Sequence, residues 1–212
     1  MAEALDLELA GEPVRLLADR ALYWPARRRL LVADLHLGKG DTFRAAGIAV
    51  PSGGTAHDLA RLQALLAATG ASSLWILGDF LHARRHRAVD TAWAAFRQAH
   101  AQVAMAVVPG NHDRAFDAVA AGVQRLADGH RDGPFELRHA PPPGPAAAHV
   151  VCGHLHPVLR LPGGLGRQPL FWLRPGLSVL PAFSAFTGGH AVAAREAAGS
   201  VVCNGAQLLR LG

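Results

Sequence analysis

The chain has 212 residues, half of them hydrophobic, which suits one well-buried domain and leaves too little for two. Its formal net charge is +5 at pH 7, and the positive charge is carried by arginine, because Lys39 is the only lysine. The apolar runs are shorter than a membrane span, the start at 1–6 is acidic and the two cysteines lie far apart, so we expect a single domain over 1–212, cytoplasmic, with reduced thiols.

The first elements read as an antiparallel meander. Leucines at positions 5, 7 and 9 alternate with polar residues, and a turn follows at 11–13. Further short apolar runs at 14–17 and 21–24 continue the meander into a fully apolar run at 30–33. We expect these segments to form consecutive strands.

Strands and helices then alternate. Apolar runs at 74–77, 103–108 and 149–152 each end at glycine or a polar residue, as buried strands do. A helix is expected from Thr55, as its capping residue, to Gly70, and a second over 91–100. Because strand, helix and strand follow one another, the strands should be parallel, with their following loops gathered at one edge of the sheet.

The C-terminal part again reads as short strands with glycine turns, from 170–173 to 208–209. A proline-rich segment at 141–145 forms a stiff loop before the run at 149–152. Two packed β-sheets flanked by helices are therefore expected.

Four clusters of acidic, amide and histidine side chains follow the apolar runs. Carboxylate, imidazole and amide oxygen are ligands for divalent metals, and the set is large enough for two ions. The sequence therefore predicts a dinuclear metallohydrolase. The clusters are Asp34-Leu35-His36, Gly78-Asp79, Gly110-Asn111-His112-Asp113 and Gly153-His154-Leu155-His156.

These motifs, in this order, resemble the calcineurin-like metallophosphoesterase superfamily. That resemblance implies an α/β fold, a four-layer αββα sandwich of two mixed β-sheets flanked by helices. Longer stretches around the motifs, from 21–24 to 180–189, are similar to the ligase-associated DNA damage response endonuclease branch. The clearest of these stretches are 33–39, 43–48, 77–84 and 152–157.

The resemblance implies a role for each ligand-type residue. One ion would be held by three residues, a second by Asn111, His154 and one further histidine, and Asp79 would bridge them. His139 is the expected further histidine, with His130 and His149 as alternatives; His82 is expected to bond to a ligand rather than bind metal itself. The three residues of the first ion are Asp34, His36 and His156.

The chemistry of the residues supports these roles. A carboxylate such as Asp79 can bridge two cations roughly 3.5–4 Å apart, so that both act on one hydroxide and on the phosphate. Asn111 supplies a neutral oxygen. His112 is then placed to protonate the leaving group as general acid, with Asp113 orienting its ring.

Arginine runs at 27–29 and at 84–87 favour a polyanion such as DNA, although solvated surface arginines would give the same count. The second run follows Gly78-Asp79, which places it at the rim of the expected site. We therefore take Lys39, Arg44, Arg84 and Arg85 as candidates for binding substrate phosphates.

Three functions are compatible with these features. The first is a phosphodiesterase or endonuclease acting on DNA, in which two divalent ions activate a hydroxide for in-line attack. The ligands suit manganese, iron and zinc alike, and the resemblance implies Mn²⁺. The second is a phosphodiesterase or pyrophosphatase for a small nucleotide or nucleotide-linked lipid, and the third a non-catalytic scaffold, which would not need His112. The resemblance further implies a bacterial DNA-repair setting with an ATP-dependent DNA ligase, a nuclease-like protein and a helicase as partners.

Overall fold

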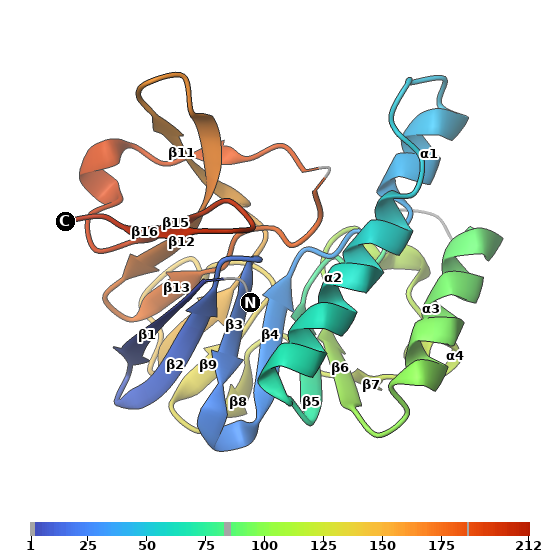
Figure 1. Ribbon diagram of the computed structural model, residues 1–212. Coiled ribbons are helices and arrows are strands. Elements are labelled where there is room, and N and C mark those ends of the chain that lie inside the picture. Colours follow the sequence, from blue (N-terminus) through green and yellow to red (C-terminus); the bar gives the residue numbers. More distant parts are fainter. Residues whose placement is uncertain (1–2, 83–85, 186) are drawn as a thin grey trace.

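The computed structural model of the chain describes residues 3–82, 86–185 and 187–212. Two β-sheets pack face to face, and the helices lie on the outer side of the first sheet (Figure 1). The three parts of the core follow this layering. One part lies between helices and first sheet, one between the two sheets, and one on the outer face of the second sheet.

The first sheet has seven strands in chain order within the described residues. Its first four strands are antiparallel, and the strands from the fourth onward are parallel, as predicted. The strands are β1 (Ala4–Leu9), β2 (Glu12–Leu17), β3 (Ala21–Trp24), β4 (Arg29–Ala33), β5 (Ser73–Leu77), β6 (Ala104–Val108) and β7 (Gln124–Arg125), with the 3₁₀ turn η1 (Pro25–Arg27) before β4.

The helices connect the parallel strands of this sheet. Leucines of α2 and aromatic residues of α3 pack on its outer face, which buries the hydrophobic stripe predicted from the sequence. These elements are α1 (Lys39–Ala45), α2 (Gly54–Thr69), α3 (Arg87–Ala99), α4 (Ala118–Ala121) and the 3₁₀ turn η2 (Asp113–Ala115).

The start of α2 differs from the prediction. Its N-cap is Gly53, in a left-handed conformation with φ +85°, and Thr55 does not cap it. The Thr55 hydroxyl instead accepts a hydrogen bond from the backbone N–H of Gly38, 3.2 Å away. The cap prediction was wrong because the glycine makes the turn by itself. The second predicted helix, expected over 91–100, corresponds to α3 and begins earlier, at Arg87.

The second sheet contains the last predicted ligand strand, β10 (His149–Cys152), which lies parallel between β9 and β13. The four ligand loops therefore do not share one sheet edge; they meet where two sheets face each other. The other strands are β8 (His130–Asp132), β9 (Phe135–Leu137), β11 (Pro157–Leu161), β12 (Gly166–Arg174), β13 (Leu177–Val179), β14 (His190–Ala191), β15 (Val201–Cys203) and β16 (Leu208–Arg210).

The expected arrangement of two mixed sheets with flanking helices is confirmed, with a thin layer on the far side. Across the described residues, α1 to α4 all lie between β4 and β7 in the chain, and the outer face of the second sheet is covered by the 3₁₀ turn η3 (Ala194–Glu196) and loops. Trp172 donates its indole N–H to the Glu196 carbonyl at 2.8 Å, which ties this turn to the sheet.

Both cysteines, Cys152 and Cys203, are buried free thiols. Burial raises the pKa of Cys203 to about 12, so this thiol is protonated and unreactive at neutral pH. In the part of the chain that the structure describes, the helices are all too short or too polar to cross a membrane.

Candidate metal centre

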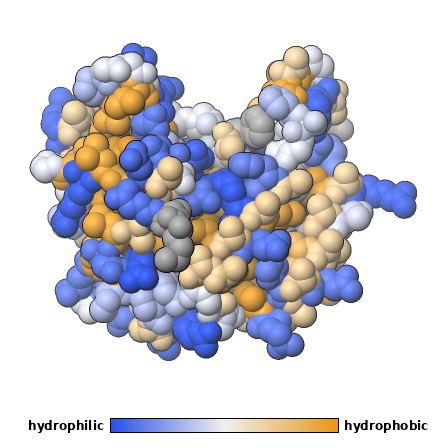
Figure 2. Space-filling model, in the orientation of Figure 1, coloured by the Kyte–Doolittle hydropathy of each residue, from blue (hydrophilic) through white to orange (hydrophobic). Residues whose placement is uncertain are grey.

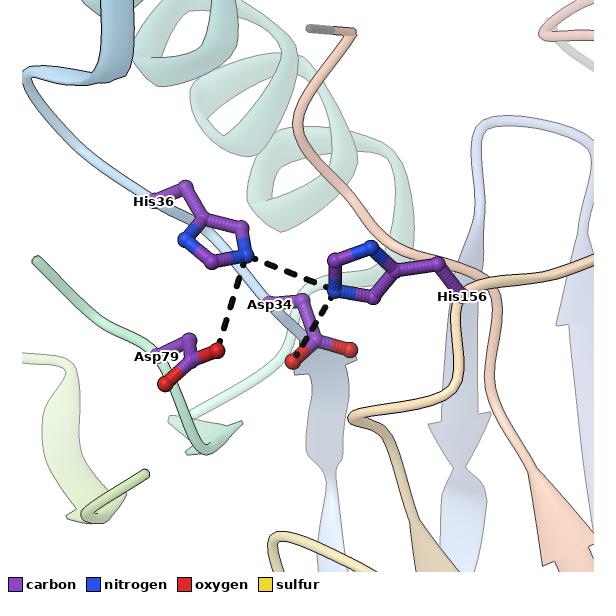
Figure 3. A group of neighbouring side chains, drawn as sticks. All are labelled: Asp34, His36, Asp79 and His156. Atoms are coloured by element: carbon purple, nitrogen blue, oxygen red, sulfur yellow. Dashed lines mark hydrogen bonds and ion pairs between the residues drawn. The ribbon is translucent and has the colours of Figure 1, made fainter. Parts of the chain in front are cut away.

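Four ligand-type side chains converge where β4, β5 and the loop before β11 meet (Figure 3). They are Asp34, His36, Asp79 and His156, and one ligand atom from each lies within 4.8 Å of all the others. The Nε2 atoms of the two histidines are 3.4 Å apart. His36 Nε2 is 3.6 Å from Asp79 Oδ2, and His156 Nε2 is 3.6 Å from Asp34 Oδ1.

A second cluster is centred on the His139 ring. His139 Nε2 lies 2.9 Å from Asn111 Oδ1 and 2.9 Å from His154 Nδ1. The same nitrogen is 3.7 Å from Asp79 Oδ1. The structure therefore brings together all seven residues expected to bind metal.

Asp79 belongs to both clusters. Its Oδ2 faces His36 and its Oδ1 faces His139 (3.6 and 3.7 Å), so the two oxygens point toward different groups of ligands. The backbone N–H of His112 donates to Oδ1 at 2.9 Å and fixes the carboxylate. This is the geometry that a bridging carboxylate requires.

The backbone of the ligand loops is unusual. Five ligand residues have positive φ: Asp34 at +53°, His36 at +47°, Asp79 at +45°, His154 at +70° and His156 at +50°. Left-handed backbone is uncommon for residues other than glycine, and it gathers at functional sites where the surrounding structure enforces it. The sharp turns aim side chains from strand ends into one pocket.

Two glycines of the motifs let these turns pack closely. A Cβ atom at Gly110 would overlap the Asp79 carboxylate, and a Cβ atom at Gly153 would overlap the side chains of Asp34 and Ala33. Both positions therefore need glycine because another chain segment occupies the space of a side chain.

The residues fit a pair of divalent cations. Asp34 Oδ1 and His139 Nδ1 are buried and have no hydrogen-bond partner among the described residues, a costly state that a cation relieves for the carboxylate. Burial lowers the pKa of His36 to about 2, so its ring is neutral at physiological pH, and neutral imidazole is the form that binds metal. Carboxylates and neutral imidazoles facing one another form a cation site.

Backbone and histidine contacts orient two of these rings. His156 Nδ1 lies 3.2 Å from the Gly188 carbonyl, so this nitrogen carries the proton and Nε2 is left to bind metal. His82 Nδ1 lies 3.4 Å from His36 Nδ1, and Asp79, not His82, occupies the space beside His36 Nε2. This position agrees with the expectation that His82 contacts a ligand.

His112 lies at the mouth of the site. Its ring stacks on His82 with centroids 5.0 Å apart and meets the His36 ring edge-on at 5.4 Å. The residue is half-buried, so one part of the ring contacts the ligand histidines and another part faces solvent. Its ring is thus a partly exposed neighbour of the ligand His36.

Asp113 has a different task from the one expected. Its Oδ2 accepts the backbone N–H groups of Gly110 and Phe80 at 2.8 and 3.1 Å, and its Oδ1 accepts that of Leu81 at 2.8 Å. The carboxylate thus joins the two ligand loops, and among the described residues it has no hydrogen bond to the His112 ring that it was expected to orient. Burial raises its pKa, and the same amide bonds oppose that shift.

The predicted phosphate-binding residues differ in their surroundings. Lys39 begins α1 directly after the first ligand loop, and burial lowers its pKa while the charges of Asp79 and Asp34 oppose that shift. Arg44 instead binds Asp41 and the Pro51 carbonyl, so its guanidinium holds the loop after α1. Arg84 and Arg85 lie outside the described residues.

The two alternative histidines lie away from the clusters. His149 Nε2 is 2.8 Å from the Ser178 hydroxyl inside the second sheet, and His130 packs edge-on against Trp75 with centroids 5.3 Å apart. Of the three candidates, His139 is the one beside Asp79.

The sequence analysis did not identify the role of Arg61, whose side chain holds separate segments of the chain together. Arg61 of α2 donates to the Phe183 carbonyl at 2.6 Å and to Asp19 at 2.8 Å, and it also pairs with Asp58 at 3.0 Å. It thereby holds the loop that continues to Gly188, whose carbonyl binds His156. The available signal was Asp58, which is a charged residue on the buried face of an otherwise apolar helix stripe.

Comparisons with known proteins agree with this geometry. A sequence profile described as calcineurin-like phosphoesterase matches residues 27–142, which include the ligand loops of the first sheet and His139. Among solved structures, the chain is similar to the crystal structure of Pseudomonas putida nuclease MPE, with 39% sequence identity, a TM-score of 0.86, and 99% of this chain and 100% of that chain covered.

A second solved structure, a protein of unknown function named AQ665 from Aquifex aeolicus, is 18% identical with a TM-score of 0.43, covering 60% of this chain and 78% of that chain. A likeness this weak supports no argument. A search of curated proteins found no match.

Proposed function

Because the chain belongs to the calcineurin-like phosphoesterase family, and is thus a metal-dependent phosphoesterase, we propose that it is a phosphodiesterase that cleaves DNA as an endonuclease. The observation that carries the proposal is Asp79, whose two oxygens face two different clusters of ligand-type side chains. The similarity to a nuclease over nearly the whole chain supports the choice of a nucleic-acid substrate.

The first ion would be held by Asp34, His36 and His156, and the second by Asn111, His139 and His154, with Asp79 between them. When bound, such a pair supplies an activated water and neutralises the charge that develops on the phosphate. The protein's part is to fix these side chains before the metal binds. Hydrogen bonds to Asp79, Asp34 and His156 from other segments perform this task.

His112 would act on the leaving group. Its position beside His36 and its partial exposure allow the ring to reach the departing oxygen and donate a proton to it. Stacking against His82 limits the orientations of the ring. Lys39 would contribute positive charge on the α1 side of the site.

The site lies open to a polymer. Figure 2 shows the surface hollowed between two projections, one carrying β11 and the other carrying α1, and the carboxyl ends of β4 and β5 lie between them. A nucleic-acid strand can pass through such a hollow, whereas a small nucleotide would be contacted on few sides. This shape favours DNA over the small-nucleotide alternative.

Several finer features belong to the same proposal. Oxygen and imidazole ligands suit manganese, iron and zinc alike, and the resemblance to the repair-associated branch makes manganese the metal that we favour. We place the enzyme in a cytoplasmic DNA-repair system, with an ATP-dependent DNA ligase, a nuclease-like protein and a helicase as partners. The support for this setting is the resemblance of the motifs to the repair-associated branch.

The test compares substrates with Mn²⁺ present. Wild-type protein should hydrolyse bis-p-nitrophenyl phosphate, nick plasmid DNA and cleave linear DNA, and hydrolyse p-nitrophenyl phosphate, a monoester, far more slowly. Asp79→Ala should lower each activity by about a thousandfold or more, since the bridging ligand supports several kcal/mol of transition-state stabilisation.

Asp6→Asn is the matched control, because this exposed aspartate pairs with Arg15 on β2, on a strand that carries no predicted ligand. Metal analysis should show loss of bound Mn²⁺ in Asp79→Ala and not in the control. Strong monoesterase activity without DNA cleavage would contradict the proposal and favour a small-molecule phosphatase.

A further inference from the structure

A groove continues from the metal centre on the side of His156. It has a volume of about 270 Å³ and lies between the loop after β13 and one face of the β11–β12 hairpin. Its lining includes His156, Thr187 and two arginines, Arg20 and Arg167, and acidic residues are absent from the described part of that lining. The groove is thus positively charged and shares a wall with the candidate metal centre.

The β11–β12 hairpin carries a further arginine, Arg160, on the same face as Arg167. Val158 pairs with Pro169 and Arg160 pairs with Arg167 across the antiparallel ladder, and residues paired in this way point to the same side. Because Val158 and Pro169 line the groove together with Arg167, Arg160 lies on the groove side as well.

This pair of arginines is unfavourable in the protein alone. Like charges directly opposite each other destabilise a hairpin by a few tenths to about 1 kcal/mol. Both arginines are exposed, and neither has an acidic partner within the described ranges. An anion bound between them would remove the repulsion.

Arg20 adds a third guanidinium at the base of the groove. Its Nη1 donates to the Ser184 carbonyl at 3.1 Å, while its Nε is buried and has no hydrogen-bond partner among the described residues. Unlike the hairpin pair, Arg20 is held by the loop that borders the metal centre. Its charge is therefore fixed on the wall of the groove that His156 also lines.

We propose that this arginine groove, defined by Arg20, Arg160 and Arg167, binds the phosphodiester backbone of the DNA strand on one side of the scissile phosphate. The proposal rests on the proposed function and adds the surface that makes the enzyme prefer a polymer. Guanidinium groups recognise phosphate oxygens through paired N–H donors, and successive arginines along a groove match successive phosphates. Free phosphate or pyrophosphate shares this chemistry and is the competing occupant.

Binding is measured without catalysis. A fluorescent 20-nucleotide DNA is titrated with protein in EDTA and its anisotropy followed at several salt concentrations. The test variant is Arg160→Gln/Arg167→Gln. The matched control, Arg125→Gln/Arg210→Gln, removes two exposed arginines that lie outside the groove.

The groove variant should bind DNA about tenfold or more weakly. Its plot of log affinity against log salt should be flatter by about 0.7 for each phosphate of the single strand that the variant no longer neutralises. The control should stay within about twofold of wild type. Equal weakening in both variants, or no weakening in either, would overturn the proposal.

A second measurement separates the two proposals. With Mn²⁺, the groove variant should have a raised KM for DNA and an unchanged kcat/KM for bis-p-nitrophenyl phosphate, which is too small to reach the groove. If pyrophosphate hydrolysis is impaired and DNA kinetics are not, the groove binds a free phosphate compound and the proposal fails. A wild type that binds DNA through the groove but cleaves no diester would contradict the proposed function alone.

Discussion

The two halves of the metal centre are built differently. The loops after β4 and β5 bind each other through their main chains, with His36 N–H donating to the Asp79 carbonyl at 2.7 Å and Leu37 N–H to the Phe80 carbonyl at 2.9 Å. The loops of the second sheet reach this half largely through side chains. His154 N–H donates to Asp34 Oδ2 at 2.8 Å, and His139 Nε2 lies 2.9 Å from Asn111 Oδ1. A main-chain bond supports them, from Phe183 N–H to the Ala33 carbonyl at 2.8 Å.

The exposure of the ligands follows the same division only in part. Asp34, His36 and Asp79 are buried on the first sheet, where Asn111 is exposed. On the second sheet His139 is buried, His156 half-buried and His154 exposed. The first sheet therefore supplies a fixed half-site, and the second sheet completes it and continues into the arginine groove. Asp34, His36 and Asp79, which main-chain hydrogen bonds hold, thus form the rigid half of the site, and His154 and His156 form the more open half.

The largest expected effect is a loss of turnover that leaves metal binding unchanged. His112→Ala should lower kcat for a phosphodiester by about 10²–10⁴-fold, because it removes the proposed general acid, while bound Mn²⁺ stays at the wild-type level. His154→Ala, in the open half, should instead lose metal. Steady-state kinetics with metal analysis of both variants distinguishes these outcomes; loss of metal in His112→Ala would show that this ring is a ligand.

A smaller effect should come from the clamp within the rigid half. In Asp113→Asn, one acceptor oxygen becomes an NH₂ group that faces backbone N–H donors. We expect the free energy of unfolding to fall by about 1.5–3 kcal/mol and activity to fall about 10–100-fold. Chemical denaturation and kinetics would measure the two changes.

Asp117→Asn is the control for this variant. Asp117 also accepts two backbone N–H bonds, at the N-cap of α4, where asparagine serves equally well. If the two variants behaved alike, Asp113 would be an ordinary loop residue, and the rigid half would not depend on it.

The smallest effect concerns pH in the metal-free protein. Burial lowers the pKa of His36 to about 2 and that of His82 to about 4, whereas unfolded histidine titrates near 6.5. Between these values the unfolded state binds more protons, so stability should decline as pH falls below about 6.5 and continue to decline toward pH 4.

Thermal unfolding in EDTA from pH 8 to pH 4 measures this dependence. His36→Gln should flatten the curve, and His57→Gln, at an exposed position on α2, should leave it unchanged. A wild-type melting temperature that is constant between pH 6.5 and pH 4 would show that the buried rings are protonated in the folded protein.

The sequence allowed the first-sheet strands that carry ligands to be predicted. The strands β4, β5 and β6 are apolar runs that stop at ligand-type residues, and this pattern depends only on neighbouring positions. His139 was expected among the ligands because it ends the apparent strand 135–138 and because of the family resemblance, and the structure places its ring 3.7 Å from Asp79. Patterns of this kind depend on neighbouring residues alone, so they can be detected before the fold is known.

The remaining features depend on contacts between distant segments. The task of Asp113 is set by three amides from two loops, and the cap of α2 by the use of Thr55 elsewhere. Arg160 and Arg167 become partners only through the register of the hairpin, which a single sequence does not specify. These features required the folded structure.

The left-handed backbone of the ligand residues has an evolutionary consequence. Each such residue costs on the order of 1 kcal/mol relative to glycine, so a mutation to glycine at one of these turns would relax the chain while removing a ligand. Descendants that no longer needed catalysis would be expected to accumulate glycine there. Retention of aspartate and histidine at these five turns would thus mark active members of a lineage more reliably than overall similarity.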